Sequence, residues 1–320
     1  MHLPATEKAL DEVLSKAVPF TTFITFLLVA FGGLELAKRR YPELINPSRL
    51  IETFKDDEDD RMPDFRWSPW AGAQRRLPAI LKASDHLNDG KHHLLLAATG
   101  SVATIKIPNI ITALSNHPNL SIRLLLSESA VNFLKAQSPE QPALSQIAKM
   151  KNVDGIYLDQ DEWRKPWIRG DSILHIELRR WADLMVIAPL SANSLAKVVQ
   201  GFSDNLINSV VRAWDATGMI DQARPGVPLP YVEGKKKGIM VAPAMNTAMW
   251  HHPVTAEHMK RLSDDWSISN GGWFEVLSPI QKELACGDTG SGAMHDWKLV
   301  VAAIEDRLQL GRGQEKAGLE

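Results

Sequence analysis

From residue 92 onward, short apolar runs alternate with amphipathic segments. The apolar runs are HHLLLAATG (92–100), SIRLLLS (121–127), ADLMVIAPLS (182–191) and KGIMVAPAM (237–245). Segments with helical spacing of apolar positions follow them, at 101–117, 129–135, 192–201 and 203–214. Continuous apolar runs of this length are typical of strands that are buried on both faces. The pattern therefore predicts an α/β fold in which helices cover both faces of a parallel sheet.

Every apolar run ends in a small or polar turn: ATGSVA, LSESA, APLSAN and APAMN. In a parallel sheet these turns share the carboxyl edge, where open α/β sheets bind ligands. Gly100 and Ser101 begin one helix, and Ser191, Asn193 and Ser194 begin another, so free N–H groups and the helix dipoles favour an anion there. The first turn is neither a GxGxxG nor a Walker loop. Simple N-capping explains each turn singly, but two of them on one edge favour a phosphorylated cofactor.

Two polar residues stand out beside these turns. Asn246 follows the last apolar run, where its amide could hold a carboxylate or could simply suit a turn. His175 lies in ILHIELRRWAD, four residues before Arg179 and five before Arg180. Taken alone, a single histidine in such an apolar pattern is more often structural than catalytic.

The only cysteine of the chain lies in the glycine-rich stretch LACGDTGSGAM, residues 284–294. A single cysteine excludes an intrachain disulfide and a multi-cysteine metal site. Cys286 could be an inert buried thiol, or a reactive thiol on a loop that closes over a substrate. The neighbouring glycines and Asp288 favour the flexible, polar loop.

The remaining sequence suggests flanking segments around one domain. We expect an N-terminal extension at 1–90, the main domain at 91–310 and a short tail at 311–320. Within the extension, 41–90 is acidic and mostly irregular, with a short helix near 75–87. Residues Arg224–Gly238, rich in Pro, Gly and Lys, predict an inserted surface loop.

An uncharged stretch near the N-terminus raises the question of a membrane. Ala17–Leu34 carries no charge over 18 residues, and Lys38, Arg39 and Arg40 follow it. This length is at the lower limit for a spanning helix. The segment 17–37 is therefore either a membrane helix, with the basic residues and the rest of the chain on the cytoplasmic side, or a buried or interfacial helix.

Composition narrows the class of protein. A hydrophobic fraction of 44% and a charged fraction of 23% are those of a globular protein with a sizeable core. A net charge of −2 gives no sign of bulk nucleic-acid binding. The scarcity of cysteine suits a reducing compartment, so we expect a cytoplasmic location.

Six segments together resemble one known family. GSVATIK, LHIELRRWAD, APLSANSLAKVVQGFSDNL, VRAWD, APAMNTAMW and LACGDTGSGAM occur in this order between Lys91 and Arg307. They resemble the phosphopantothenoylcysteine decarboxylases, which are flavin-containing cysteine decarboxylases, in their eukaryotic stand-alone form. The resemblance implies a flavodoxin-like or Rossmann-like fold, FMN as cofactor, no metal, and a homotrimer with active sites between subunits. Residues 1–90 have no counterpart in the core of that family, and the 216–237 segment is longer than the usual link of the family.

The resemblance also implies roles for individual residues. FMN contacts fall on Gly100, Ser101 and Val102, on Ser127 and Ser129, on Ser191, Ala192, Asn193 and Ser194, and on Ala244. The catalytic residues are His175 and Cys286, and the substrate contacts are Asn246, Arg180, Gly287 and Asp288.

The implied reaction removes the carboxylate of 4'-phosphopantothenoyl-L-cysteine and yields 4'-phosphopantetheine, in coenzyme A biosynthesis. Transient oxidation of the thiol end gives the departing carboxylate an electron sink, and the hydride is later returned. His175 would assist at the substrate thiol, and Cys286 would donate a proton late in the reaction. Some fungal relatives instead act as halotolerance-type subunits that inhibit a protein phosphatase, which is the alternative function. Because His175, Asn246 and Cys286 occur together, a self-sufficient enzyme is favoured.

Overall fold

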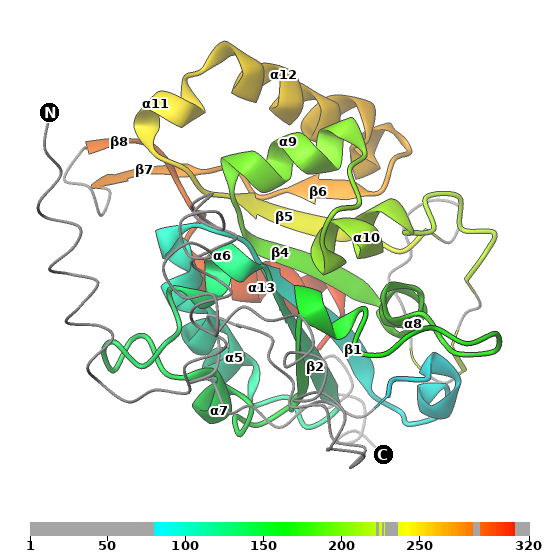
Figure 1. The fold of residues 1–320 in the computed structure, drawn as a ribbon. Helices are drawn as coiled ribbons and strands as arrows, with labels where there is room; N and C mark the ends of the chain where they lie inside the picture. The colour runs from blue at the N-terminus through cyan, green and yellow to red at the C-terminus, as the bar shows by residue number, and fades with distance from the viewer. Residues whose placement is uncertain (1–79, 222–223, 226, 228–235, 284–288, 311–320) are drawn as a thin grey trace, which may run out of the picture. The chain divides into compact units, whose positions relative to one another are not determined.

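The computed structural model describes residues 80–221, 224–225, 227, 236–283 and 289–310 (Figure 1). All of them belong to one compact unit, Ser68–Glu320. Among these residues, no helix is both long and apolar enough to cross a bilayer. The segment 17–37, which the sequence leaves open as a membrane helix, lies outside the described residues.

A six-stranded parallel sheet forms the centre of the unit (Figure 1). Its strands are β1 His92–Ala98, β2 Leu120–Leu126, β3 Val153–Leu158, β4 Leu184–Leu190, β5 Ile239–Pro243 and β6 Phe274–Val276. They lie in the order β3-β2-β1-β4-β5-β6, which is the order of a doubly wound sheet. Every residue of β1, β2 and β4 is buried, so the predicted α/β fold is confirmed. The apolar-run pattern misses β3, whose first three residues are only partly buried or exposed.

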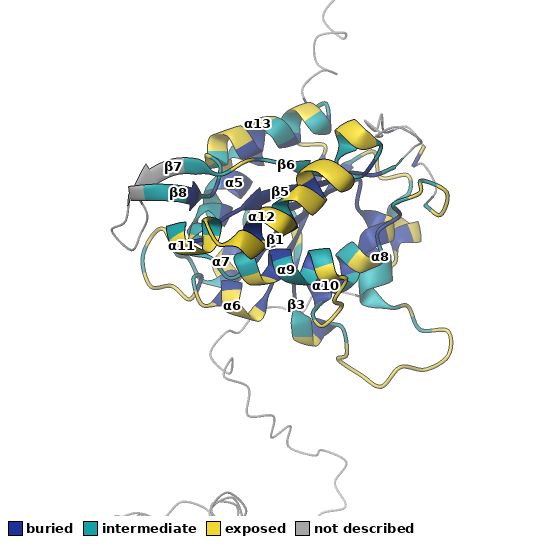
Figure 2. Ribbon diagram, turned by 90° about the horizontal axis from the view of Figure 1, so that it is seen from above, coloured by how far each residue is buried: buried dark blue, intermediate teal, exposed yellow. Residues whose placement is uncertain are grey.

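Helices cover both faces of the sheet, because successive strand residues point to opposite sides. Leu94 and Leu96 of β1 pack into one core, and Leu95 and Ala97 pack into the other. The first core includes residues of α5 Ile107–Leu114, α6 Glu128–Val131, α7 Leu144–Ile147 and α13 Trp297–Arg307. The second includes residues of α8 Leu174–Trp181, α9 Ala192–Gln200 and α10 Leu206–Arg212, with α12 Pro253–Lys260 packed against it. Figure 2 shows that the helices expose their outer sides while the strands between them are buried.

Short elements complete the unit. They are η1 Ala83–His86, η2 Val102–Lys106, η3 Asp159–Asp161, α11 Thr247–Trp250, η5 Arg261–Asp265 and η6 Ile268–Asn270. A two-stranded antiparallel hairpin, β7 Ile280–Glu283 and β8 Thr289–Ala293, stands apart from the main sheet.

Two flanking segments differ from their predictions. Leu81 and Ala83, predicted to lie in the mostly irregular extension before the domain, are buried, and the N–H of Ala83 donates to Glu177 Oε2 at 2.7 Å. The surface-loop prediction for 224–238 is wrong at Arg224 and Lys237, whose side chains are buried. The Lys237 ammonium donates to the backbone carbonyls of Arg179, in the last turn of α8, and of Ala182, directly after it, at 2.8 Å each, which anchors this end of the insertion. Local composition suggested a loop, but only tertiary contacts provide these buried acceptors.

Candidate functional site

The carboxyl ends of β1 and β4 meet where the strand order reverses, which is the position at which doubly wound sheets bind ligands. Thr99 joins the two turns there. Its Oγ1 donates to the carbonyl of Pro189 at 3.0 Å and accepts the N–H of Ser191 at 2.7 Å. The sequence interpretation did not single out Thr99, although its place between the strand and Gly100 is a signal that could have found it. Through Thr99, the first and third predicted turns form one structure.

Gly100 brings the second turn against the first. A Cβ at Gly100 would lie 2.6 Å from the Cβ of Ser129, closer than side-chain atoms can approach. Ser127 caps α6, and its N–H donates to the carbonyl of Ala98 at 3.1 Å. Glycine at position 100 therefore permits the contact between the two turns, and a larger residue would push them apart.

The third turn presents the start of α9 to this edge. Ser191 is the N-cap, and its Oγ accepts the N–H of Ser194 at 3.4 Å. The simple capping role therefore holds for this pair of serines. Asn193 is exposed at the same turn, and the first-turn N–H groups of a helix have no helical acceptor. This helix start can receive a phosphate, and Val102 across the edge, 45% exposed, offers apolar contact to a ring.

Asn246 lies in the fourth turn, directly after β5. Its backbone is extended rather than strained, with φ −69° and ψ 165°. Its Oδ1 accepts the N–H of Met249 at 2.8 Å and so caps α11, while the residue remains exposed. Because the carbonyl side of the amide is used, the NH₂ side remains available as a donor to a ligand. Ala244 is buried, and its N–H donates to Leu190, which joins this turn to the third.

The residues around Cys286 connect the two strands of a hairpin, and this hairpin packs beside the Asn246 turn. Cys286, Gly287 and Asp288 lie outside the described residues, in the connection between β7 and β8. At the base of the hairpin, the N–H of Met245 donates to Gly292 at 2.9 Å, and a Cβ on Gly290 would overlap Thr247. These two glycines therefore allow close packing of β8 against the Asn246 turn, a reason different from the loop flexibility expected from sequence.

His175 lies at the start of α8 and faces a buried carboxylate. Its Nδ1 is 2.7 Å from Glu162 Oε1 in the segment after β3. The side chain of His175 is 23% exposed and that of Glu162 is 6% exposed. Glu162 follows β3 and Asn246 follows β5; three strands separate these two, so at about 4.8 Å per strand their ends are about 19 Å apart. The contact with Glu162 therefore places His175 toward the β3 side of the sheet, whereas Asn246 lies at the β5 side.

Arg180 lies in the last turn of α8, away from His175. Five residues of helix separate the two, a rise of about 7.5 Å. The Arg180 side chain is 55% exposed and pairs with Glu177 at 3.1 Å. Its predicted contact with the substrate stays a prediction, since nothing else at the carboxyl edge contacts it among the described residues.

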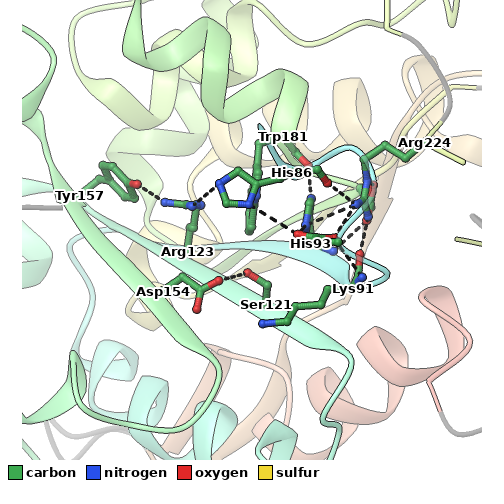
Figure 3. Close-up of polar contacts among 11 residues, drawn as sticks. His86, Lys91, His93, Ser121, Arg123, Asp154, Tyr157, Trp181 and Arg224 are labelled. Atoms are coloured by element: carbon green, nitrogen blue, oxygen red, sulfur yellow. Dashed lines mark hydrogen bonds and ion pairs between the residues drawn. The ribbon is translucent and has the colours of Figure 1, made fainter. Parts of the chain in front are cut away.

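A separate polar cluster lies at the opposite, amino edge of the sheet (Figure 3). His86, Asp89 and His93 lie close enough to one another to hold a metal ion. The Arg224 guanidinium, however, lies 3.3 Å from both Asp89 Oδ1 and His93 Nε2, and it also pairs with Asp183. Burial lowers the pKa of the His93 imidazole, Asp183 opposes that shift, and Arg224 adds to it. The cluster already contains its cation, so it anchors the insertion rather than offering a vacant metal site.

Known proteins match the part of the chain that contains the sheet and the turns at its carboxyl edge. Residues 82–309 match the family model described as Flavoprotein. A probable phosphopantothenoylcysteine decarboxylase of Arabidopsis thaliana is 41% identical over 215 residues, which are 67% of this chain and 87% of that protein. A probable thymidylate synthase of Schizosaccharomyces pombe is 39% identical over 234 residues, 73% of this chain. The match spans only 32% of that longer relative.

Solved structures agree in fold. A variant of PPC decarboxylase complexed with pantothenoylaminoethenethiol has a TM-score of 0.52 and 37% identity, covering 67% of this chain and 97% of that one. The FMN binding protein AtHal3 has a TM-score of 0.50 and 38% identity, covering 67% and 95%. The family match, 82–309, contains all six strands of the main sheet and all four turns at its carboxyl edge.

Proposed function

The chain belongs to the Flavoprotein family, among the phosphopantothenoylcysteine decarboxylases, and on that basis we propose that it decarboxylates 4'-phosphopantothenoyl-L-cysteine with the aid of FMN. The products are 4'-phosphopantetheine and carbon dioxide, and the reaction is a step of coenzyme A biosynthesis. The observation that carries the proposal is the carboxyl edge of the sheet. There, four turns meet around the point where strand order reverses, and Asn246 is exposed in the fourth of them.

The residues at this edge fit FMN. Gly100 has no Cβ to separate the first two turns, the start of α9 suits a phosphate, and Val102 is exposed. The residues that would hold the cofactor are Gly100, Ser101, Val102, Ser127, Ser129, Ser191, Ala192, Asn193, Ser194 and Ala244. When bound, FMN supplies a reversible two-electron oxidation of the thiol end of the substrate, so that no external electron acceptor is consumed.

The protein side chains orient the substrate and move protons. The Asn246 NH₂ group can donate to the substrate carboxylate without neutralising its charge, because the Oδ1 atom is held by α11. The carboxylate can therefore still leave as carbon dioxide. His175 can take the proton of the substrate thiol, and the Cys286 thiol can return a proton to the carbon after decarboxylation.

The separation of His175 from Asn246 supports an oligomeric site. Glu162, which contacts His175, follows β3, and the ends of β3 and β5 are about 19 Å apart in one chain, a span that favours side chains from two chains at one small group. A homotrimer in which His175 of one subunit faces the Asn246 turn of the next would bring them together. The substrate site would then lie between subunits.

The direct test combines a spectrum with a product assay. Purified protein should show the absorbance of bound oxidised flavin and should release carbon dioxide from phosphopantothenoylcysteine. Cys286→Ser should still release carbon dioxide but should accumulate an oxidised product, because the final proton donor is lost. A colourless protein that releases no carbon dioxide but captures a protein phosphatase would overturn the proposal in favour of the regulatory function.

A further inference from the structure

The Glu162 side chain is a buried carboxylate, and none of the reaction steps proposed above uses it. Its side chain is only 6% exposed, and its Oε1 lies 2.7 Å from Nδ1 of His175. The second carboxylate oxygen, Oε2, is buried and has no hydrogen-bond partner in the described part of the chain. Burying a carboxylate with so little compensation is costly. Such an arrangement therefore calls for a reason beyond the stability of the fold.

The backbone around Glu162 is fixed independently of His175. Asp161, the preceding residue, accepts the N–H of Leu158 at 2.7 Å and pairs with Arg164 at 3.2 Å. The N–H of Glu162 itself donates to the carbonyl of Asp159 at 3.3 Å. Glu162 also borders a cavity of about 260 Å³ beside the start of α8. The carboxylate is thus presented to His175 from a braced turn after β3.

This contact determines which nitrogen of His175 carries the hydrogen. A carboxylate can only accept, so Nδ1 must be the donor. In the neutral ring the lone pair then lies on Nε2, which is the nitrogen able to accept a proton from a substrate. Once Nε2 is protonated, the negative charge of Glu162 stabilises the imidazolium. The same logic applies to carboxylates that orient catalytic histidines in other enzymes.

We propose that Glu162 is a positioning residue that holds His175 in the Nδ1–H tautomer and so makes its Nε2 the base for the substrate thiol. This inference rests on the proposed function, because it assigns the partner of a residue in that reaction. Glu162 does not contact the substrate; it acts through His175.

The test uses Glu162→Gln in the FMN-loaded protein. Without the carboxylate, the ring is free to adopt the other tautomer, so kcat should fall about 10- to 100-fold while KM changes little. The loss should disappear in a His175→Asn background, because Glu162 acts only through that ring. Glu140→Gln, at an exposed carboxylate away from this turn, is the matched control and should leave kcat unchanged.

A second measurement does not depend on turnover. Nitrogen-15 NMR of the wild-type histidine rings, with His175 assigned by its loss in His175→Asn, should show hydrogen on Nδ1. Glu162→Gln should shift that population toward the Nε2–H form. An Nε2–H tautomer in the wild type, or equal losses from Glu162→Gln with and without His175, would overturn the inference. A wild type that has the expected tautomer but no decarboxylase activity would instead refute the proposed function alone.

Discussion

At the scale of single residues, the site depends on the missing Cβ of Gly100 and on both ends of the Asn246 amide. Gly100 has no Cβ, and this lets the turn after β1 approach Ser129. Asn246 has two functions at once, since its carbonyl oxygen caps α11 while its NH₂ group remains available to a ligand. A substitution at Gly100 should therefore test the contact between the turns. A substitution at Asn246 that keeps the helix cap should change activity without changing stability.

We expect Gly100→Ala to weaken FMN binding. The added Cβ, 2.6 Å from that of Ser129, forces the first two turns apart at a cost of about 1–3 kcal/mol, or about tenfold or more in affinity. Fluorescence titration with FMN measures the effect. The double variant Gly100→Ala/Ser129→Gly removes the obstructing Cβ and, because Ser129 is itself assigned to FMN, should bind as tightly as Ser129→Gly alone. If Gly100→Ala weakens binding equally with serine and with glycine at position 129, steric separation is not the cause.

Asn246→Asp should separate capping from substrate binding. Aspartate caps a helix about as well as asparagine, so the free energy of unfolding should change by less than about 0.5 kcal/mol. The new carboxylate repels the substrate carboxylate, and kcat/KM should fall about 100-fold or more. Asn246→Ala is the comparison, with a loss of about 1 kcal/mol from the missing cap. Normal kcat/KM in Asn246→Asp would exclude Asn246 as the carboxylate donor.

At the scale of elements, buried charges tie the inserted segment to the helices before it. The Asp215 carboxylate, just after α10, accepts the N–H groups of Thr217, Gly218, Ile220 and Asp221 within 3.0 Å. Burial alone raises the pKa of Asp215, but these donors and the Thr217 hydroxyl outweigh it and hold the pKa far below its usual value. The backbone at the start of the insertion is therefore held by hydrogen bonds to a single carboxylate, that of Asp215.

The expected consequence is a stability difference that depends on pH. Asp215→Asn should cost about 2 kcal/mol near pH 7, where the wild-type carboxylate is charged. Because the folded pKa is lowered, the contribution is complete above the unfolded value of about 3.9 and is lost as pH falls below it. Urea unfolding of both proteins at pH 7 and near pH 3 measures this. Exposed Asp85→Asn is the control, and a difference that stays constant with pH would contradict the assignment.

At the scale of the whole molecule, the order of the strands decides which residues can cooperate. Asn246 and the hairpin that carries the Cys286 loop lie at one side of the carboxyl edge, after β5. Glu162, which contacts His175, follows β3, the strand at the other side of the sheet. One chain therefore offers two halves of a site, and the proposed trimer would join halves from neighbouring subunits.

Mixing two inactive variants tests that assembly. His175→Asn and Asn246→Ala should each have little activity alone. If sites form between subunits, random co-assembly in a trimer restores one site in each mixed trimer, about a quarter of all sites. Co-expressed, differently tagged chains purified through both tags should therefore regain measurable activity. Absence of recovery in a verified mixed trimer would place both residues in one subunit's site.

The amino-acid sequence by itself determined the class of fold and the turns that carry the chemistry. Strands buried on both faces are mostly apolar and end in turns, and both features are local in the sequence. Tertiary structure alone decided the rest. Strand order separates His175 from Asn246, the glycines of β8 serve close packing, and Arg224 and Lys237 are buried in the insertion. Glu162 belongs to the same group, since its link to His175 joins residues 13 apart through space, and no local pattern encodes such a contact.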